Sequence, residues 1–355
     1  MENREEKNEE RPEEMTDGTK EEERKTKSLR ETKPPIIVIT VAVVILLVIG
    51  FMIYRAKRWV GSGRFYIDTS IDTETETDDR VSVLPADIYR SNDDGVTRIV
   101  FFGNDTFGDT SDGPSICRLL QENTTATIYD CTFPGSTMTA NSKLLPSESG
   151  EPLDLFSLYW LWDCKKNDDL RAQEEAIEIA EGIDKELYRE HLKLLNDLDF
   201  NDIDYMVIAY DGHDYLMGHA PFYGEDYYTQ TCIHGVVYAM SEKIFPYYPE
   251  IQVVFVSPSF CYARDEDGNR VSGDLYRING ESLTSGIQYL KDVTQLYGFS
   301  YVDDYFGTNI NQETAEEYLT KDDVVPNLEG KKLIAAHVLN KLIRRVEVVE
   351  TDDAK

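Results

Sequence analysis

The sequence has little positive charge. Of its 355 residues, 36 are Lys or Arg and 67 are Asp or Glu, so the formal net charge is −31 at pH 7. Residues 59–355 hold 55 of the acids and only 24 of the bases. A surface this acidic repels phosphate backbones, and we therefore expect no nucleic-acid partner. The hydrophobic content of 41% is enough for a sizeable core and excludes a wholly disordered chain.

Cysteine is also scarce. Five cysteines stand at wide spacings without a CxxC pair, so the sequence predicts neither a zinc ribbon nor a disulfide framework. We interpret them as small buried apolar side chains, and the sequence leaves open whether one pair is bridged. No motif for a cofactor or a resident metal is present, and we expect neither. The cysteines are Cys117, Cys131, Cys164, Cys232 and Cys261.

One long apolar run stands near the N-terminus. Ile36 to Tyr54 is 19 residues without a charge, long enough for a helix to cross a hydrocarbon core. The basic and aromatic segment Arg55 to Trp59 follows, as an interface anchor would. The sequence therefore predicts a transmembrane helix at residues 35–55, that is, a single-pass signal anchor.

The flanking charge gives the expected orientation. Six Lys or Arg lie in the 20 residues before the apolar run and four in the 20 after it, a slight bias toward a cytoplasmic N-terminus. We expect a disordered cytoplasmic tail at 1–34 and an acidic, solvated stalk at 56–96. A folded extracytoplasmic domain at 97–345 and an acidic tail at 346–355 complete the expected order.

Within residues 97–345, short apolar runs alternate with longer amphipathic segments. This alternation predicts an α/β fold with a five-stranded parallel sheet covered on both faces. Sites in such sheets lie beyond the carboxyl ends of the strands. The expected strands are Arg98–Phe102, Ala126–Tyr129, Tyr205–Ala209, Val253–Val256 and Ser300–Val302, and the expected helical segments are Arg171–Asn196, Gln230–Tyr247, Leu283–Tyr297 and Leu328–Arg344.

Four loops carry polar motifs. In this order and at these strand ends they resemble the blocks of the SGNH/GDSL hydrolase family, over roughly Arg98 to Leu342. The resemblance implies a three-layer α/β/α, flavodoxin-like domain and an ester hydrolase with a serine nucleophile, an oxyanion hole built with a Gly and an Asn, and a terminal Asp and His. The four loops are Gly103–Gly108, Asp130–Thr137, Tyr210–Tyr215 and Asp322–Gly330.

The first two blocks carry the family's nucleophile and oxyanion glycine. Matched without gaps, the first block places Asn104 at the family's Asp and Asp105 at its nucleophilic Ser, so the hydroxyl is missing. In the second block, Gly135 matches the oxyanion glycine.

The last two blocks depart further from the family. The third places Asp211 at the family's Gly, His213 at its oxyanion Asn and Asp214 at its Asp. In the last block Asp322 matches the orienting Asp, whereas Val325 stands in place of the catalytic His. Acyl transfer on this scaffold needs a hydroxyl, an imidazole base and oxyanion donors.

These losses predict a catalytically inactive domain that binds or scaffolds at a bacterial cell envelope, with an unidentified protein partner or a surface carbohydrate as ligand. Two enzymes are the alternatives. One is an active deacetylase of cell-surface carbohydrate with displaced catalytic residues, in which His219 is the substitute base. The other is a metal-dependent hydrolase that uses Asp105, His213 and Asp322. We assign structural roles to the remaining histidines, His191, His234 and His337.

Aromatic residues gather in two segments. Rings suit flat amphipathic ligands such as sugars, although core and lid packing account for many of them. The carbohydrate interpretation follows mainly from the family resemblance. The residues are Tyr159, Trp160, Trp162, Phe222, Tyr223, Tyr227 and Tyr228.

Overall fold

The computed structural model describes residues 44–50, 67, 77–81, 94–108, 113–144, 150–222, 224 and 226–342. The chain divides into two units, Met1–Arg64 and Phe65–Lys355. In the first unit, residues 44–50 form a helix with exposed apolar side chains. No helix among the described residues has both the length and the apolar character needed to span a membrane. The rest of the expected transmembrane segment, both terminal tails and most of the expected stalk lie outside the described residues.

The second unit is built on one parallel sheet. Its five strands lie in the order β2-β1-β3-β4-β7, and all four neighbouring pairs are parallel. This confirms the predicted five-stranded α/β sheet, and the strand order is the doubly wound, flavodoxin-like one. The strands are β1 Arg98–Gly103, β2 Thr127–Asp130, β3 Tyr205–Ala209, β4 Gln252–Val256 and β7 Ser300–Val302.

Alternate strand residues enter two cores, one on each face of the sheet. Val100 and Phe102 of β1 belong to one core, and Ile99 and Phe101 belong to the other. The periodicity of two in a strand dictates this division. Because both faces are buried, the strands read as continuous apolar runs and not as alternating ones.

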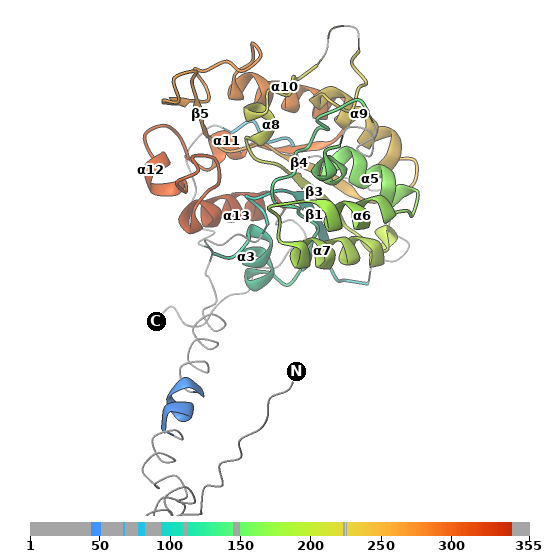
Figure 1. Cartoon of the computed structure of the whole chain (residues 1–355). Coiled ribbons are helices and arrows are strands. Elements are labelled where there is room, and N and C mark those ends of the chain that lie inside the picture. The colour runs from blue at the N-terminus through green and yellow to red at the C-terminus, as the bar shows by residue number, and fades with distance from the viewer. Residues whose placement is uncertain are drawn as a thin grey trace, which may run out of the picture. The chain divides into compact units, whose positions relative to one another are not determined.

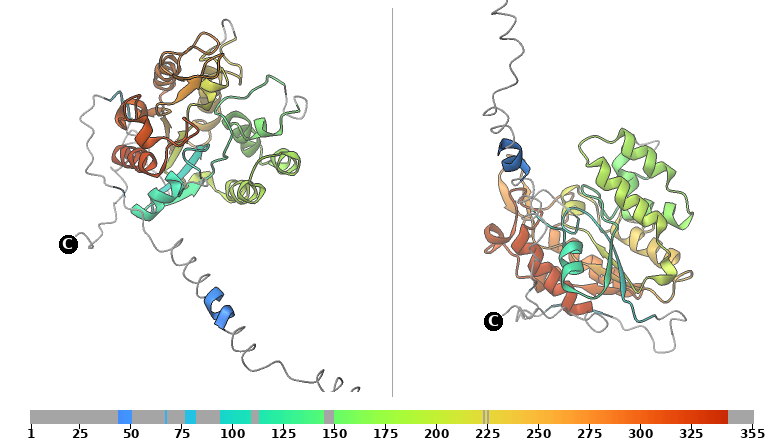
Figure 2. Two further views of the ribbon diagram at one scale, coloured as in Figure 1. Left: turned by 60° about the vertical axis from the view of Figure 1, so that its left-hand side comes forward. Right: turned by 90° about the horizontal axis from the view of Figure 1, so that it is seen from below.

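Helices cover both faces (Figure 1). The first core receives residues from α5 Leu158–Lys166, α6 Arg171–Ile179, α7 Lys185–Asp197, α9 Ile233–Ile244 and α10 Leu283–Leu296. The second receives residues from α3 Ile116–Asn123, α12 Ala315–Tyr318 and α13 Leu328–Leu342. Figure 2 shows α3 and α13 close together, away from α6 and α7. The remaining elements are short: η1 Pro152–Phe156, η2 Phe200–Asp202, α8 His213–Leu216, α11 Asp304–Gly307 and the hairpin β5 Tyr262–Arg264 with β6 Arg270–Ser272.

The predicted elements need two corrections. The segment Arg171–Asn196 is two helices, because the chain turns at Gly182, whose φ of +78° suits glycine. The β5–β6 hairpin was not predicted, since its three-residue strands are too short to carry a period. The other three helices lie within the expected segments.

Two of the described residues in the expected stalk at 56–96 contact the folded unit. Ile67 is 1% exposed and belongs to the second core. Arg80 pairs with Tyr301 of β7 through backbone hydrogen bonds of 2.8 and 3.0 Å, which form an isolated antiparallel bridge at that edge of the sheet. The polar composition around Arg80 gave no sign of this pairing, because backbone hydrogen bonds form without apolar side chains.

Ion pairs connect Asp79, which precedes Arg80, to the helix α13. The Asp79 carboxylate contacts Lys341 Nζ at 2.6 Å and His337 Nε2 at 3.6 Å. His337 Nδ1 lies 2.7 Å from Asp304 Oδ1, and both side chains are buried. Burial opposes the charge on His337, but the hydrogen bond with Asp304 and the nearby charge of Asp79 raise its pKa to about 9. His337 therefore has a structural role, as predicted.

We expect His337→Gln to lower the free energy of unfolding by about 3 kcal/mol, because it leaves the buried Asp304 carboxylate without its cation. The pKa of His337 in the folded chain exceeds the unfolded value of about 6.5, so its stabilisation is complete below that pH and is lost as pH rises through 9. Urea unfolding at pH 6 and pH 10 measures both effects. Lys332→Gln, which removes an exposed ion pair with Glu329, is the control and should change stability by less than about 1 kcal/mol. An equal loss at both pH values would contradict the assignment.

Candidate functional site

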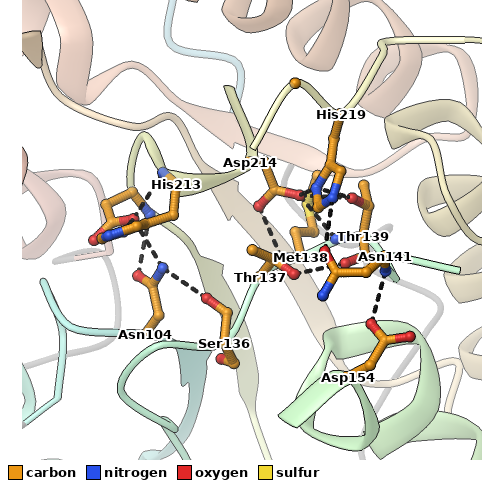
Figure 3. A network of polar contacts seen from close by, with 12 residues as sticks. Asn104, Ser136, Thr137, Met138, Thr139, Asn141, Asp154, His213, Asp214 and His219 are labelled. Atoms are coloured by element: carbon orange, nitrogen blue, oxygen red, sulfur yellow. Dashed lines mark hydrogen bonds and ion pairs between the residues drawn. The ribbon is translucent and has the colours of Figure 1, made fainter. Parts of the chain in front are cut away.

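The candidate site lies at the carboxyl edge of the sheet, where the loops after β1, β2 and β3 meet. Parallel strands end at the same edge, so residues distant in sequence converge there. Figure 3 shows two neighbouring polar networks at this edge, one around His213 and one around His219. The first network contains the family-equivalent position His213, and the side chain of Asp105, another such position, lies close to it.

Asp105 and Gly135 contact each other directly. The backbone N–H of Gly135 donates a hydrogen bond to Asp105 Oδ2 at 2.6 Å. Gly135 has a φ of +81°, a conformation that glycine adopts without strain. Burial and the neighbouring Asp211 charge raise the pKa of Asp105, although the Gly135 amide opposes this rise. The amide that would serve an oxyanion is therefore engaged by a carboxylate of the chain itself.

His213 is bound to a buried carboxylate. Its Nδ1 lies 2.6 Å from Asp211 Oδ1, and the side chain of Asp211 is 1% exposed. The charge of Asp211 is the main cause that raises the pKa of His213 to about 9, against the opposing effect of burial. At neutral pH the imidazole is a cation, with no free lone pair to accept a proton.

Asp211 is the centre of this network. Asn104 Nδ2 donates to Asp211 Oδ1 at 2.8 Å and to the carbonyl of Ser136 at 3.0 Å. Thr106 Oγ1 donates to Asp211 Oδ2 at 3.2 Å. Both oxygens of the buried carboxylate are thus satisfied, as burial requires. Asp211 stands at a family glycine, and no role was expected for it. The signal available was a carboxylate two residues after the fully buried strand β3.

One group of side chains has the composition of a metal site. Ligand-type atoms of Asp105, Asp211 and His213 lie within 4.8 Å of one another. Two carboxylates and an imidazole can coordinate zinc or manganese. A cation bound through Asp211 would have to compete with the hydrogen bonds from Asn104, Thr106 and His213. The metal-binding set expected from the sequence had Asp322 in place of Asp211, and the structure does not bring Asp322 into this group.

Asp322 and Val325 lie on the turn before α13. Asp322 is exposed, whereas the adjacent Asp323 is 6% exposed and forms ion pairs with Arg264 and Arg270. Val325 is 8% exposed, and its alkyl side chain cannot form a hydrogen bond or an ion pair with the Asp322 carboxylate. The described geometry therefore contains no Asp–His pair on this loop.

His219 belongs to the second network. Its Nδ1 lies 3.1 Å from Asp214 Oδ1 and its Nε2 lies 2.9 Å from Asn141 Oδ1, so both ring nitrogens are engaged. Asp214 also accepts backbone hydrogen bonds from Met138 and Thr139 at 2.8 and 2.9 Å. Burial would raise the pKa of Asp214, but the hydrogen bonds outweigh it and lower the pKa. These contacts fit a structural role for His219 and not that of a substitute base.

Comparisons with known proteins find likeness in structure only. No family model and no curated protein matches the sequence. The lipase/acylhydrolase from Enterococcus faecalis is 13% identical, with 72% of this chain and 100% of that chain covered and a TM-score of 0.41. A protein from Slackia heliotrinireducens assigned as an SGNH hydrolase is 15% identical, with 70% and 99% covered and a TM-score of 0.38. A protein from Lactobacillus plantarum is 12% identical, with 70% and 97% covered and a TM-score of 0.46.

Identities and scores this low carry no statement about activity. The strand order of this chain and the positions of its motif-bearing loops agree with the fold that the sequence resemblance implies. The chain has an SGNH-hydrolase-like α/β fold.

Proposed function

We propose that this protein is a non-hydrolytic, SGNH-hydrolase-like binding domain, held at the outer face of a bacterial cell membrane by the helix expected at residues 35–55. The observation that carries the loss of hydrolysis is the 2.6 Å hydrogen bond from the Gly135 amide to Asp105 Oδ2. It places an anion of the chain where the family places its nucleophile, and it engages the donor that an oxyanion would need. Protease digestion of the outer domain on intact cells, with the N-terminal tail spared, tests the placement.

The remaining catalytic roles are also unfilled. Val325 cannot take a proton, and the cation at His213 has no acceptor nitrogen to offer at neutral pH. Loss of the nucleophile or base alone lowers turnover by about 10⁶ in serine hydrolases. A binding role remains for the loops at this edge of the sheet, and we propose a surface carbohydrate as the ligand. Exposed rings at Phe222, Tyr227 and Tyr228 support that proposal, whereas Trp162 is 1% exposed and belongs to the core.

A metal-dependent hydrolase is the second candidate, favoured by the convergence of Asp105, Asp211 and His213. We expect micromolar Zn²⁺ or Mn²⁺ to leave the melting temperature unchanged, because Asp211 is already saturated with donors and His213 is protonated. Differential scanning fluorimetry measures this. A metal-induced rise in melting temperature would favour the metal enzyme if the double variant Asp105→Asn, His213→Asn abolished it and the variant Asp322→Asn preserved it.

We expect the full-length protein to hydrolyse a short-chain p-nitrophenyl ester at the background rate and to resist fluorophosphonate labelling. Asp105→Ser alone should remain inactive, because no base stands near the new hydroxyl. The triple variant Asp105→Ser, His213→Asn, Val325→His restores nucleophile, oxyanion donor and base, and should raise turnover above background. Stoichiometric labelling of any serine in the unaltered protein would overturn the proposal.

The protonation state of His213 is a separate prediction. We expect its pKa near 9, because Asp211 stabilises the imidazolium, and a fall toward the usual value of about 6.5 in Asp211→Asn. NMR titration of the imidazole resonances measures both. His234, which hydrogen-bonds Tyr289 and Tyr297 and whose pKa is lowered by burial, is an internal control that the substitution should leave unchanged. A His213 pKa below 7 in the unaltered protein would contradict this prediction and make His213 a candidate base.

A further inference from the structure

An aromatic surface patch is formed by the helices α9 and α10, which pack against each other (Figure 1), and by the loop before α9. Neighbouring rings have centroids 4.5 to 6.1 Å apart, so they make one continuous cluster. Three of the rings are exposed by 41 to 63%. These three are Phe222, Tyr227 and Tyr228, and the patch is completed by His234, Tyr238, Tyr289 and Tyr297.

His234 ties the two helices together at the centre of the patch. Its Nδ1 lies 2.8 Å from the hydroxyl of Tyr289, and its Nε2 lies 3.0 Å from the hydroxyl of Tyr297. Burial lowers the pKa of His234, so the imidazole is neutral at pH 7. A neutral imidazole donates through one nitrogen and accepts through the other. The centre of the patch is therefore uncharged, and its rings are held in place by hydrogen bonds within the chain.

The bases on these elements are already engaged. The helices α9 and α10 carry one lysine each, Lys243 and Lys291. Lys243 contacts Asp163 at 2.6 Å, and Lys291 contacts Asp78 at 2.8 Å. The loop at residues 217–232 contains no lysine or arginine. The elements that form the patch therefore offer no unpaired cation among the described residues.

The acids beside the patch are exposed. Glu242 of α9 adds to the effect of burial in raising the pKa of Tyr297, and Asp292 of α10 adds to it for Tyr289. Both carboxylates thus act on rings of the patch. Their charge attracts cations to this surface and repels anions.

Tyrosine rings elsewhere in the chain show what such a surface can bind. Three of them have a lysine or arginine of the chain over the ring, at 3.7 to 4.6 Å from its centroid. Among the described residues, no lysine or arginine lies over a ring of the patch. The exposed rings of the patch are therefore open to a cation from another molecule. The three pairs are Lys243 with Tyr159, Lys166 with Tyr247 and Arg270 with Tyr262.

We propose that the aromatic patch binds a polymer of amino sugars whose amines are protonated. The inference rests on the proposed function in one respect, because it names the class of carbohydrate. The apolar face of a sugar stacks on an exposed ring, and an ammonium group is attracted to the ring face and to Glu242 and Asp292. An anionic polysaccharide would gain the stacking but would be repelled by the two carboxylates. The patch thus selects among carbohydrates by charge.

The test is isothermal titration calorimetry of the full-length chain in phosphatidylcholine nanodiscs at pH 6, with empty nanodiscs as the blank. The probes are β-linked hexasaccharides with the same backbone. The glucosamine hexamer carries ammonium groups, the N-acetylglucosamine hexamer carries acetamides in their place, and cellohexaose carries hydroxyls. We expect the glucosamine hexamer to bind at least about tenfold more tightly than the other two, because it alone gains the cation–π and ionic contacts.

Substitutions separate binding at the patch from attraction by the net charge. Tyr228→Ala should weaken the glucosamine hexamer at least about fivefold. Tyr247→Ala removes a comparably exposed tyrosine outside the patch and should leave binding within about twofold.

The carboxylates have their own matched control. Glu242→Gln with Asp292→Asn should weaken the glucosamine hexamer at least about fivefold and leave cellohexaose within about twofold. Glu175→Gln with Glu190→Gln removes two exposed carboxylates from α6 and α7 and should leave both probes within about twofold.

The outcomes distinguish this inference from the proposed function. Equal binding of cellohexaose and the glucosamine hexamer would overturn the inference and leave a carbohydrate ligand standing, whereas failure of all three probes to bind would overturn both. Binding that the patch variants leave unchanged would reduce the effect to net charge and overturn the patch. A hexalysine peptide that binds as tightly, and that Tyr228→Ala weakens, would replace the sugar by a basic polypeptide. Ester turnover by the unaltered protein would overturn the proposed loss of hydrolysis and leave this result standing.

Discussion

The buried carboxylate of Asp211 is the interaction on which the candidate site depends. An anion removed from water must be surrounded by donors, and this one draws them from the loop after β1 and from the start of α8. Asn104, Thr106 and His213 are fixed by this requirement. The charge of Asp211 also sets the protonation of His213 and adds to the raised pKa of Asp105.

The electrostatics of the site follow from that centre. A cation at His213 lies near the carboxylates of Asp211 and Asp105, and the Gly135 amide binds the second of these. These groups satisfy one another's charges and hydrogen bonds, and this supports our proposal that the site does not stabilise charge developing on a substrate. This arrangement is the reverse of an oxyanion hole, in which donors are left unpaired until the transition state forms.

A pocket with a largely apolar lining borders the candidate site, and this bears on the proposed binding role. Asp211 and Gly212 border the pocket, so a ligand there would contact the backbone that holds His213. Loss of hydrolysis does not require loss of binding, because apolar burial and shape act independently of a nucleophile. A domain of this fold can keep ligand binding after losing hydrolysis.

The sequence determined the parts that depend on local pattern. Continuous apolar runs identified the five strands, and the ungapped first and third loops placed Asp105 and His213 at one edge of the sheet, where the structure has them. The tertiary structure alone decided which groups pair. Asp211, and not Asp322, completes the cluster with Asp105 and His213, and Arg80 pairs with Tyr301 of β7 although its neighbours are polar. Hydrogen bonds and ion pairs between distant residues depend on distances that only folding fixes, whereas hydrophobic periodicity is written residue by residue along the chain.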